Sequence, residues 1–134
     1  MEAEKKSADE LMDELRLAAL EALEVYVGKD KVSAEEAEPF LSKTYRTIYS
    51  WLSGKKMYLP RFEDVRPILE FVKLVEELTE KWKKVLTEFH GERNGTIGLY
   101  DRDMLRVLEG DQPISTKIVQ LVKLSLRKLA AEKK

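Results

Sequence analysis

Residues 33–52 read SAEEAEPFLSKTYRTIYSWL, and this stretch decides the fold of the chain. Ser33 and Glu36 have the spacing of a capping box, in which each side chain accepts a hydrogen bond from the backbone N–H of the other residue. The box predicts a short helix over 34–41. A second short helix, opened by a threonine, is predicted over 44–53. The two helices are therefore expected to form a tight pair.

The apolar residues of this pair are placed to fix the angle at which the helices cross. Such a pair needs a small residue where the second helix crosses the first, and Ala37 supplies it. The apolar residues that would pack the pair are Phe40, Leu41, Ile48, Trp51 and Leu52. On residues alone, an αα-hairpin with no DNA-binding role remains the alternative.

The stretch resembles the helix-turn-helix of the excisionase and MerR-like DNA-binding families. Their pattern runs as a capping Ser or Thr, then Ala-Glu-Glu-Ala, Phe-Leu, a turn, and Arg-Thr-Ile-Tyr before a Trp. The match covers residues 33–52 without a gap, with Ser42 at the turn position where these families usually have glycine. The resemblance implies that the chain binds double-stranded DNA and that its second helix enters the major groove.

Helix geometry selects the side chains of 44–53 that would face the DNA. At about 100° per residue, turning Ile48 inward also turns Trp51 and Leu52 inward. The opposite side, called the reading strip below, is predicted to contact base edges and consists of Arg46, Tyr49, Ser50 and Ser53. Flanking residues are predicted to contact phosphates: Lys43, Thr44, Tyr45, Thr47, Lys55, Lys56 and Arg61. For each basic residue taken alone, a solvated surface role is the alternative.

The rest of the chain also reads as helices, so the sequence predicts an all-α fold, a helix-turn-helix bundle of about six helices. Further helices are predicted over 8–27, from about Phe62 to His90, near 100–109 and over 115–131. Residues 96–100 are the one candidate strand. The expected division is an N-terminal unit with the DNA-binding pair over 1–61, a connecting helix over 62–90 and a C-terminal helical unit over 91–134.

The long helix carries a heptad pattern that predicts a core or coiled-coil seam. Its members are Ile68, Val72, Val75, Thr79, Trp82, Leu86 and Phe89. A homodimer is expected, because one short recognition helix seldom gives enough affinity, and the seam is its expected surface unless the last helix covers it. The alternative function is a non-catalytic interaction or oligomerisation module that uses this Ile68–Phe89 seam.

The C-terminal third repeats part of the pattern, since 45–54 can be laid on 101–110 with Arg46 over Arg102. Residues 99–124 also weakly resemble the recognition-helix half of Cro/CI-type repressor domains. The repeat predicts two tandem helix-turn-helix-like units and a second DNA site at Arg102 and Arg106. Acidic neighbours of these arginines would repel phosphate, so a degenerate unit that serves packing or dimerisation is the alternative.

Composition excludes several classes of function for these 134 residues. The absence of cysteine and the single histidine exclude thiolate and multi-histidine metal sites. No Gly-rich phosphate loop or hydrolase motif occurs, so we expect no enzyme, no cofactor and no small-molecule substrate. No apolar run reaches the ~20 residues of a membrane span, so a cytoplasmic protein with no membrane partner is expected.

Two further features concern charge and heat. The net charge of −1 hides an uneven distribution, because 81–134 holds twelve basic and seven acidic residues and so carries +5. One Asn and two Gln among abundant Glu and Lys match the bias reported for thermophile proteins. The function predicted from the whole sequence is a sequence-specific DNA-binding protein, either a transcriptional regulator or an accessory factor of a mobile element.

Overall fold

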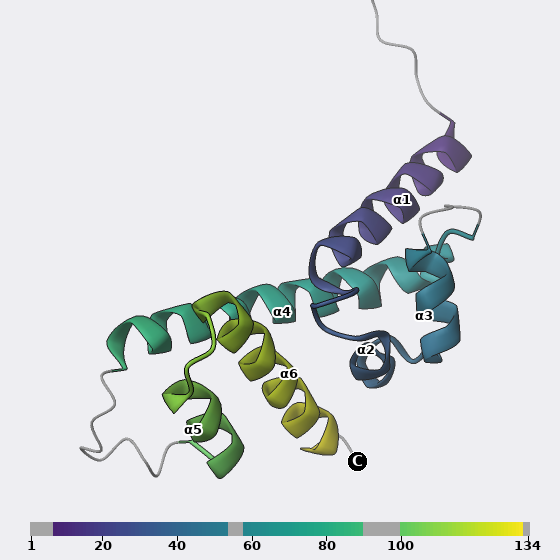
Figure 1. The fold of residues 1–134 in the computed structure, drawn as a ribbon. Helices are drawn as coiled ribbons and strands as arrows, with labels where there is room; N and C mark the ends of the chain where they lie inside the picture. Colours follow the sequence, from purple (N-terminus) through teal and green to yellow (C-terminus); the bar gives the residue numbers. More distant parts are fainter. Residues whose placement is uncertain (1–6, 54–57, 90–99, 133–134) are drawn as a thin grey trace, which may run out of the picture.

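The computed structural model describes residues 7–53, 58–89 and 100–132, and its regular structure in these ranges is helical (Figure 1). The six helices are α1 (Ala8–Tyr26), α2 (Ala34–Leu41), α3 (Tyr45–Leu52), α4 (Phe62–Glu88), α5 (Arg102–Glu109) and α6 (Ile114–Glu132). Beyond them the described ranges hold one isolated bridge, between Val27 and Val32. The predicted all-α class with about six helices is confirmed. Most of the candidate strand, 96–99, lies outside the described residues.

Side chains at the helix starts explain where the helices begin. The Ser7 hydroxyl accepts a hydrogen bond from the Glu10 N–H at 3.1 Å and caps α1. Ser33 and Glu36 make both hydrogen bonds of the predicted capping box at α2. Asp101 caps α5 by accepting from the N–H three residues later, at 2.8 Å. These local signals account for the close match between predicted and observed helix starts.

Helices α4 and α6 each differ slightly from their predicted ranges. Helix α6 begins at Ile114, and its first turn closes through the Pro113 carbonyl, which accepts from the Lys117 N–H at 3.0 Å. Ser115, where the predicted range 115–131 begins, therefore lies inside the first turn of α6. Helix α4 ends at Glu88, and the predicted stop at His90 lies outside the described residues.

Helix α4 is the central element of the described bundle. Helices α1, α2 and α6 all contact it directly (Figure 1). The heptad seam faces these neighbours, so Ile68, Val75 and Trp82 are at most 2% exposed. The seam is therefore part of the intramolecular core. Because α6 packs on α4, the condition under which the seam would not be the dimer surface is met, and the seam that the interaction-module alternative would use is largely covered within the chain.

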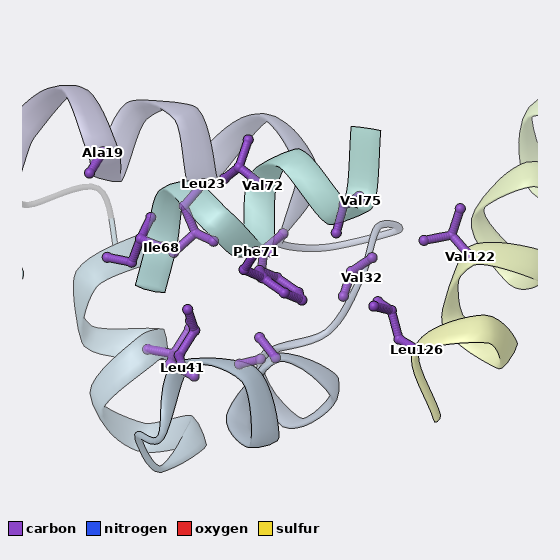
Figure 2. Close-up of a cluster of buried hydrophobic side chains, with 14 of the residues drawn as sticks. Ala19, Leu23, Val32, Leu41, Ile68, Phe71, Val72, Val75, Val122 and Leu126 are labelled. Carbon is purple, nitrogen blue, oxygen red and sulfur yellow. The ribbon is translucent and has the colours of Figure 1, made fainter. Parts of the chain in front are cut away.

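One continuous core joins the N-terminal and C-terminal parts of the described chain. Figure 2 shows Val122 and Leu126 of α6 directed toward Val32, in the loop between α1 and α2, and toward Val75 of α4. Arg127 adds an ion pair from α6 to Glu36 of α2, with 3.0 Å between Nε and Oε2. Helix α4 is thus a shared core helix and not a bare connection between two units.

A buried polar contact fixes α6 on α4. The Trp82 indole N–H donates to the Ser125 hydroxyl at 2.9 Å, and that hydroxyl donates to the Leu121 carbonyl at the same distance. The ring of Trp82 also meets Tyr100, with 5.8 Å between ring centroids.

Among the helices of the described ranges, none has the length and apolar character needed to cross a membrane.

Candidate nucleic-acid interface

Helices α2 and α3, with the turn 42–44 between them, form the helix-turn-helix unit. The predicted crossing residue Ala37 is fully buried, and Ile48 and Trp51 are at most 4% exposed. Phe40 anchors the pair to the bundle by stacking on Phe71 of α4, with 5.3 Å between ring centroids. The apolar spacing read from the sequence therefore produces the packed helix pair that it predicted.

The turn places Ser42 in the left-handed conformation, with φ 54° and ψ 38°. Its N–H donates to the Glu38 carbonyl at 2.9 Å and closes the C-terminal end of α2. Glycine adopts this conformation without steric cost, whereas side chains with a Cβ are disfavoured there. The backbone of this turn thus has a conformation at Ser42 that glycine would adopt without strain.

The reading strip lies on the solvent side of α3. Arg46, Tyr49, Ser50 and Ser53 are all exposed, and Tyr49 is 69% exposed. Helix α3 packs on α2 and α1, whereas α5 packs on α6 at the other end of the bundle (Figure 1). The C-terminal third therefore leaves the strip open to solvent. That exposure is a geometric condition for contact with a large partner.

Two serine hydroxyls of the strip are already used as donors. The Ser50 hydroxyl donates to the Arg46 carbonyl and the Ser53 hydroxyl to the Ser50 carbonyl, each at 2.9 Å. Both oxygens keep lone pairs directed to solvent, so they are best suited to accept hydrogen bonds. The Arg46 guanidinium is the strip's strong donor. Its Nε lies 3.5 Å from the Tyr45 hydroxyl, too far for that contact to hold it in place.

Lys43 has an intramolecular partner that the sequence did not indicate. Its ammonium lies 3.2 Å from the carboxylate of Asp64, which is 7% exposed and also accepts the Arg61 N–H at 3.0 Å. This ion pair ties the turn of the helix-turn-helix unit to the first turn of α4. A phosphate contact of Lys43 would have to compete with this ion pair, because releasing the lysine would leave a buried carboxylate unpaired.

The start of α3 also differs from the prediction. Thr44 is the N-cap residue, but its side chain makes no capping hydrogen bond and instead lies 3.3 Å from the Thr47 hydroxyl. The carboxylate of Glu38, on α2, accepts the Tyr45 N–H. An acidic group thus occupies the positive end of the α3 dipole, a place that would otherwise favour a phosphate. No acidic residue lies between 43 and 56 in the sequence. The carboxylate of Glu38 reaches the start of α3 only because the chain turns between α2 and α3.

The other predicted phosphate residues divide into two groups. Thr44, Tyr45, Thr47 and Arg61 are exposed beside the strip, and Arg61 pairs loosely with Glu63 at 3.7 Å. Lys55 and Lys56 lie outside the described residues.

One cation near the strip was missed by sequence reasoning. Lys29, in the loop between α1 and α2, is exposed and lines the same groove as Tyr49 and Ser53. Glu35 lines this groove too, so the groove carries both signs of charge. The loop is held by a backbone hydrogen bond from the Gly28 N–H to the Val32 carbonyl at 3.0 Å. No local motif marks Lys29, because its position depends on how α1 packs beside α3.

The predicted second DNA site has a different surface. Arg102 and Arg106 are exposed on α5, and Arg106 lies 4.0 Å from the carboxylate of Asp103. The groove between α5 and α6 holds further cations, Lys123 and Arg127, and both pair with Glu36. Within the described ranges, no three His, Cys, Asp or Glu side chains are grouped to hold a metal ion.

Comparisons of this chain with protein-family models, with curated proteins and with solved structures found no match.

Proposed function

We propose that the chain is a sequence-specific double-stranded DNA-binding protein that reads the major groove with α3. The observation that carries this proposal is the reading strip, an exposed, acid-free side of a helix whose other side is locked into the core. A helix held in this way can enter the major groove as a rigid body. The resemblance of residues 33–52 to the excisionase and MerR-like helix-turn-helix supports the same role.

The chemistry of the strip suggests which base edges it reads. Arg46 can donate two hydrogen bonds to O6 and N7 of one guanine. The hydroxyls of Ser50 and Ser53 donate to backbone carbonyls. Their oxygens are therefore suited to accept hydrogen bonds from the amino groups of cytosine or adenine. Tyr49 presents an exposed aromatic ring that can pack against a thymine methyl group. The proposed site is therefore a short mixed sequence that includes at least one G·C pair.

Phosphate contacts would fix the register of α3 in the groove. Thr44, Tyr45, Thr47 and Arg61 flank the strip, and Lys29 approaches it from the loop between α1 and α2. Because Glu38 occupies the start of α3, we place the phosphates along the sides of the helix and not at its N-terminus. Lys55 and Lys56 stay in the proposed phosphate set on sequence grounds.

The role of such binding is that of a transcriptional regulator or an accessory factor of a mobile element, acting in the cytoplasm without catalysis. The α5 surface is less suited to DNA, since Asp103 stands beside Arg106. We therefore assign DNA contact to α3 alone and treat α5 as a packing element of the C-terminal region.

The direct test is selection of bound duplexes from a random pool, followed by binding measurements at several salt concentrations. A recurring motif and an affinity that falls steeply with salt are expected. Arg46→Ala should cost roughly 1–3 kcal/mol and relax preference at one base pair. Arg102→Ala, which removes the corresponding arginine of α5, is the matched control and should leave affinity unchanged. Equal losses in both variants, or no selected motif, would refute reading by α3.

A second experiment tests the missed cation. Lys29→Ala should weaken binding to all sequences alike and lower the salt slope by about one. Lys128→Ala, which removes an exposed lysine of α6, should do neither. An unchanged slope in the Lys29 variant would remove this loop from the proposed interface.

A further inference from the structure

Helix α1 has a second apolar face in addition to the one buried in the core. The core face holds Ala19, Leu20 and Leu23, all fully buried. A separate line of residues, called the α1 stripe, recurs at spacings of 4, 3, 4 and 3: Leu11, Leu15, Ala18, Ala22 and Val25. Its large members are open to solvent, with exposed fractions of 49%, 48% and 58% for the two leucines and the valine. This spacing is that of a helix that packs along another helix.

The exposed apolar surface continues from α1 onto the first turns of α4. Phe62 is 51% exposed and Leu69 is 44% exposed, and both line a groove with Leu15. In Figure 1, α1 crosses beside the N-terminal half of α4. Single exposed apolar residues are ordinary, but a contiguous patch of this kind marks an interaction surface.

The charges along the two edges of this surface favour a second copy of the chain as its partner. Helix α1 carries six acidic residues and one basic residue, and Glu21 lies about 80° around the helix from the stripe, away from the core side. The α4 edge of the groove holds Arg66 and Lys73 together with Glu63 and Glu70. Arg66 already pairs with Glu70 at 2.9 Å, so Lys73 is the cation of this edge that would face the acidic edge of the other copy. A two-fold axis parallel to α1 brings the acidic edge of each copy against the α4 edge of the other.

The size of the surface also fits a self-association. A helix of 19 residues is about 28 Å long and 10–12 Å wide, so the α1 stripe covers roughly 300 Å² and the first turns of α4 add about 150–200 Å². Two such faces meet at an interface of about 1,000 Å², the lower end of what a specific complex needs. A dimer of this size is expected to dissociate on dilution.

We propose that the chain forms a homodimer in which the α1 stripe of each copy packs on the α1 stripe and the Phe62–Leu69 surface of the other. This interface differs from the heptad seam of α4, which is covered within the chain. The proposal does not depend on DNA binding, because the association is measured with protein alone. If DNA binding also holds, the dimer would present two α3 helices to two half-sites.

Sedimentation equilibrium at rising protein concentration tests the association. The average mass should rise from the 15.6 kDa of one chain toward twice that value. Leu15→Glu and Val25→Glu should each hold the mass at that of one chain, because each substitution places a charge within the α1 stripe. Ile114→Glu is the matched control, since Ile114 is 66% exposed on α6 away from the stripe, and it should associate like the unsubstituted chain. A monomer at every concentration, or loss of association only in the control, would overturn the proposal.

A cross-link locates the interface without placing a charge in it. The chain has no cysteine, and Ala18 is exposed at the middle of the stripe, where it meets its own copy whichever way the helices run. Ala18→Cys should form a disulfide-linked dimer on mild oxidation, and Ile114→Cys should not. Circular dichroism should show unchanged helix content for both. A chain that dimerises but cross-links through the cysteine at 114 and not at 18 would refute this face.

Discussion

Helices α3 and α5 are two versions of one local design with different outer surfaces. Each has eight residues, and each carries an arginine at a corresponding place. Helix α3 buries Ile48 and Trp51, three residues apart, and α5 buries Met104 and Leu108, four residues apart. On α3 the exposed side holds arginine, tyrosine and serine, with no acid. On α5 it holds arginines beside Asp103 and Glu109. Similar amphipathic patterns thus bury one side of each helix, while the polar residues decide what each exposed surface can bind.

The two helices also differ in how their starts are stabilised. Asp101 caps α5 from the preceding position in the chain, whereas α3 receives its carboxylate from Glu38 on the neighbouring helix. Helix α3 rests on α2 and α1, and α5 rests on α6. The start of α3 is therefore stabilised by a residue of the neighbouring helix, whereas the start of α5 is stabilised by the residue just before it in the sequence. The following predictions test this contrast.

The largest expected effect comes from giving α3 the acidic pattern of α5. In the alignment of the two segments, Thr47 corresponds to Asp103 and Ser53 to Glu109. The double variant Thr47→Asp with Ser53→Glu should lower DNA affinity by several kcal/mol, because the carboxylate at 47 faces phosphate and the one at 53 brings a negative charge into the groove in place of a base-reading hydroxyl. Both positions are exposed, so thermal stability should barely change. Binding by fluorescence anisotropy measures the loss.

The reciprocal variant, Asp103→Thr with Glu109→Ser, is the control for this prediction. It should leave specific affinity at the original level if α5 stays away from the DNA. A change in DNA affinity as large as that of the first variant would contradict the assignment of DNA contact to α3 alone.

A second contrast concerns two serines with the same local hydrogen bond. Ser125 and Ser50 both donate to the carbonyl four residues earlier, but only Ser125 also accepts from the buried Trp82 indole. Ser125→Ala should lower the free energy of unfolding by about 1–3 kcal/mol, since it leaves a buried donor without a partner. Ser50→Ala should change it by less than about 0.5 kcal/mol. Urea unfolding separates the two, and equal losses would refute the explanation.

Most of the fold could be predicted from the sequence because its signals are local. Capping side chains at Ser7, Ser33 and Asp101 lie within three residues of the groups they satisfy. The inward positions Ile48 and Trp51 follow from helix geometry alone. These interactions span one helical turn, so spacing in the sequence is sufficient to find them.

The parts that could not be predicted depend on contacts between distant segments. The Lys43–Asp64 ion pair and the place of Lys29 beside Tyr49 exist only once the helices have packed. The same holds for apolar patterns. The heptad seam of α4 lies in the core, whereas the α1 stripe has the same spacing but its Leu11 and Leu15 are exposed. Periodicity identifies an apolar face but not the element that covers it.

A smaller effect is expected at the turn of the α3 unit. Ser42→Gly should raise the free energy of unfolding by about 0.5–1 kcal/mol, because relief of the left-handed conformation exceeds the added entropy of glycine in the unfolded chain. The C-cap residue of α5, Gly110, has φ −70°, so its backbone does not require glycine. There an added Cβ would lie 3.2 Å from the Arg106 carbonyl, so Gly110→Ala should bring no gain. Calorimetry on both variants decides whether turn geometry distinguishes the two units.

The smallest expected effect appears at alkaline pH and only on the N-terminal side of the bundle. Burial raises the pKa of Tyr26 on α1. The carboxylate of Glu76, which accepts a hydrogen bond from the Tyr26 hydroxyl, raises this pKa further, as do the negative charges of Glu76 and Glu80. The folded chain therefore keeps this proton at a pH where the unfolded chain has lost it. Stability from Tyr26 is complete below its ordinary pKa of about 10 and is lost as pH rises through the raised pKa. Tyr26→Phe should flatten the decline of unfolding free energy above about pH 10. A decline of the same steepness in this variant would show that another group causes it.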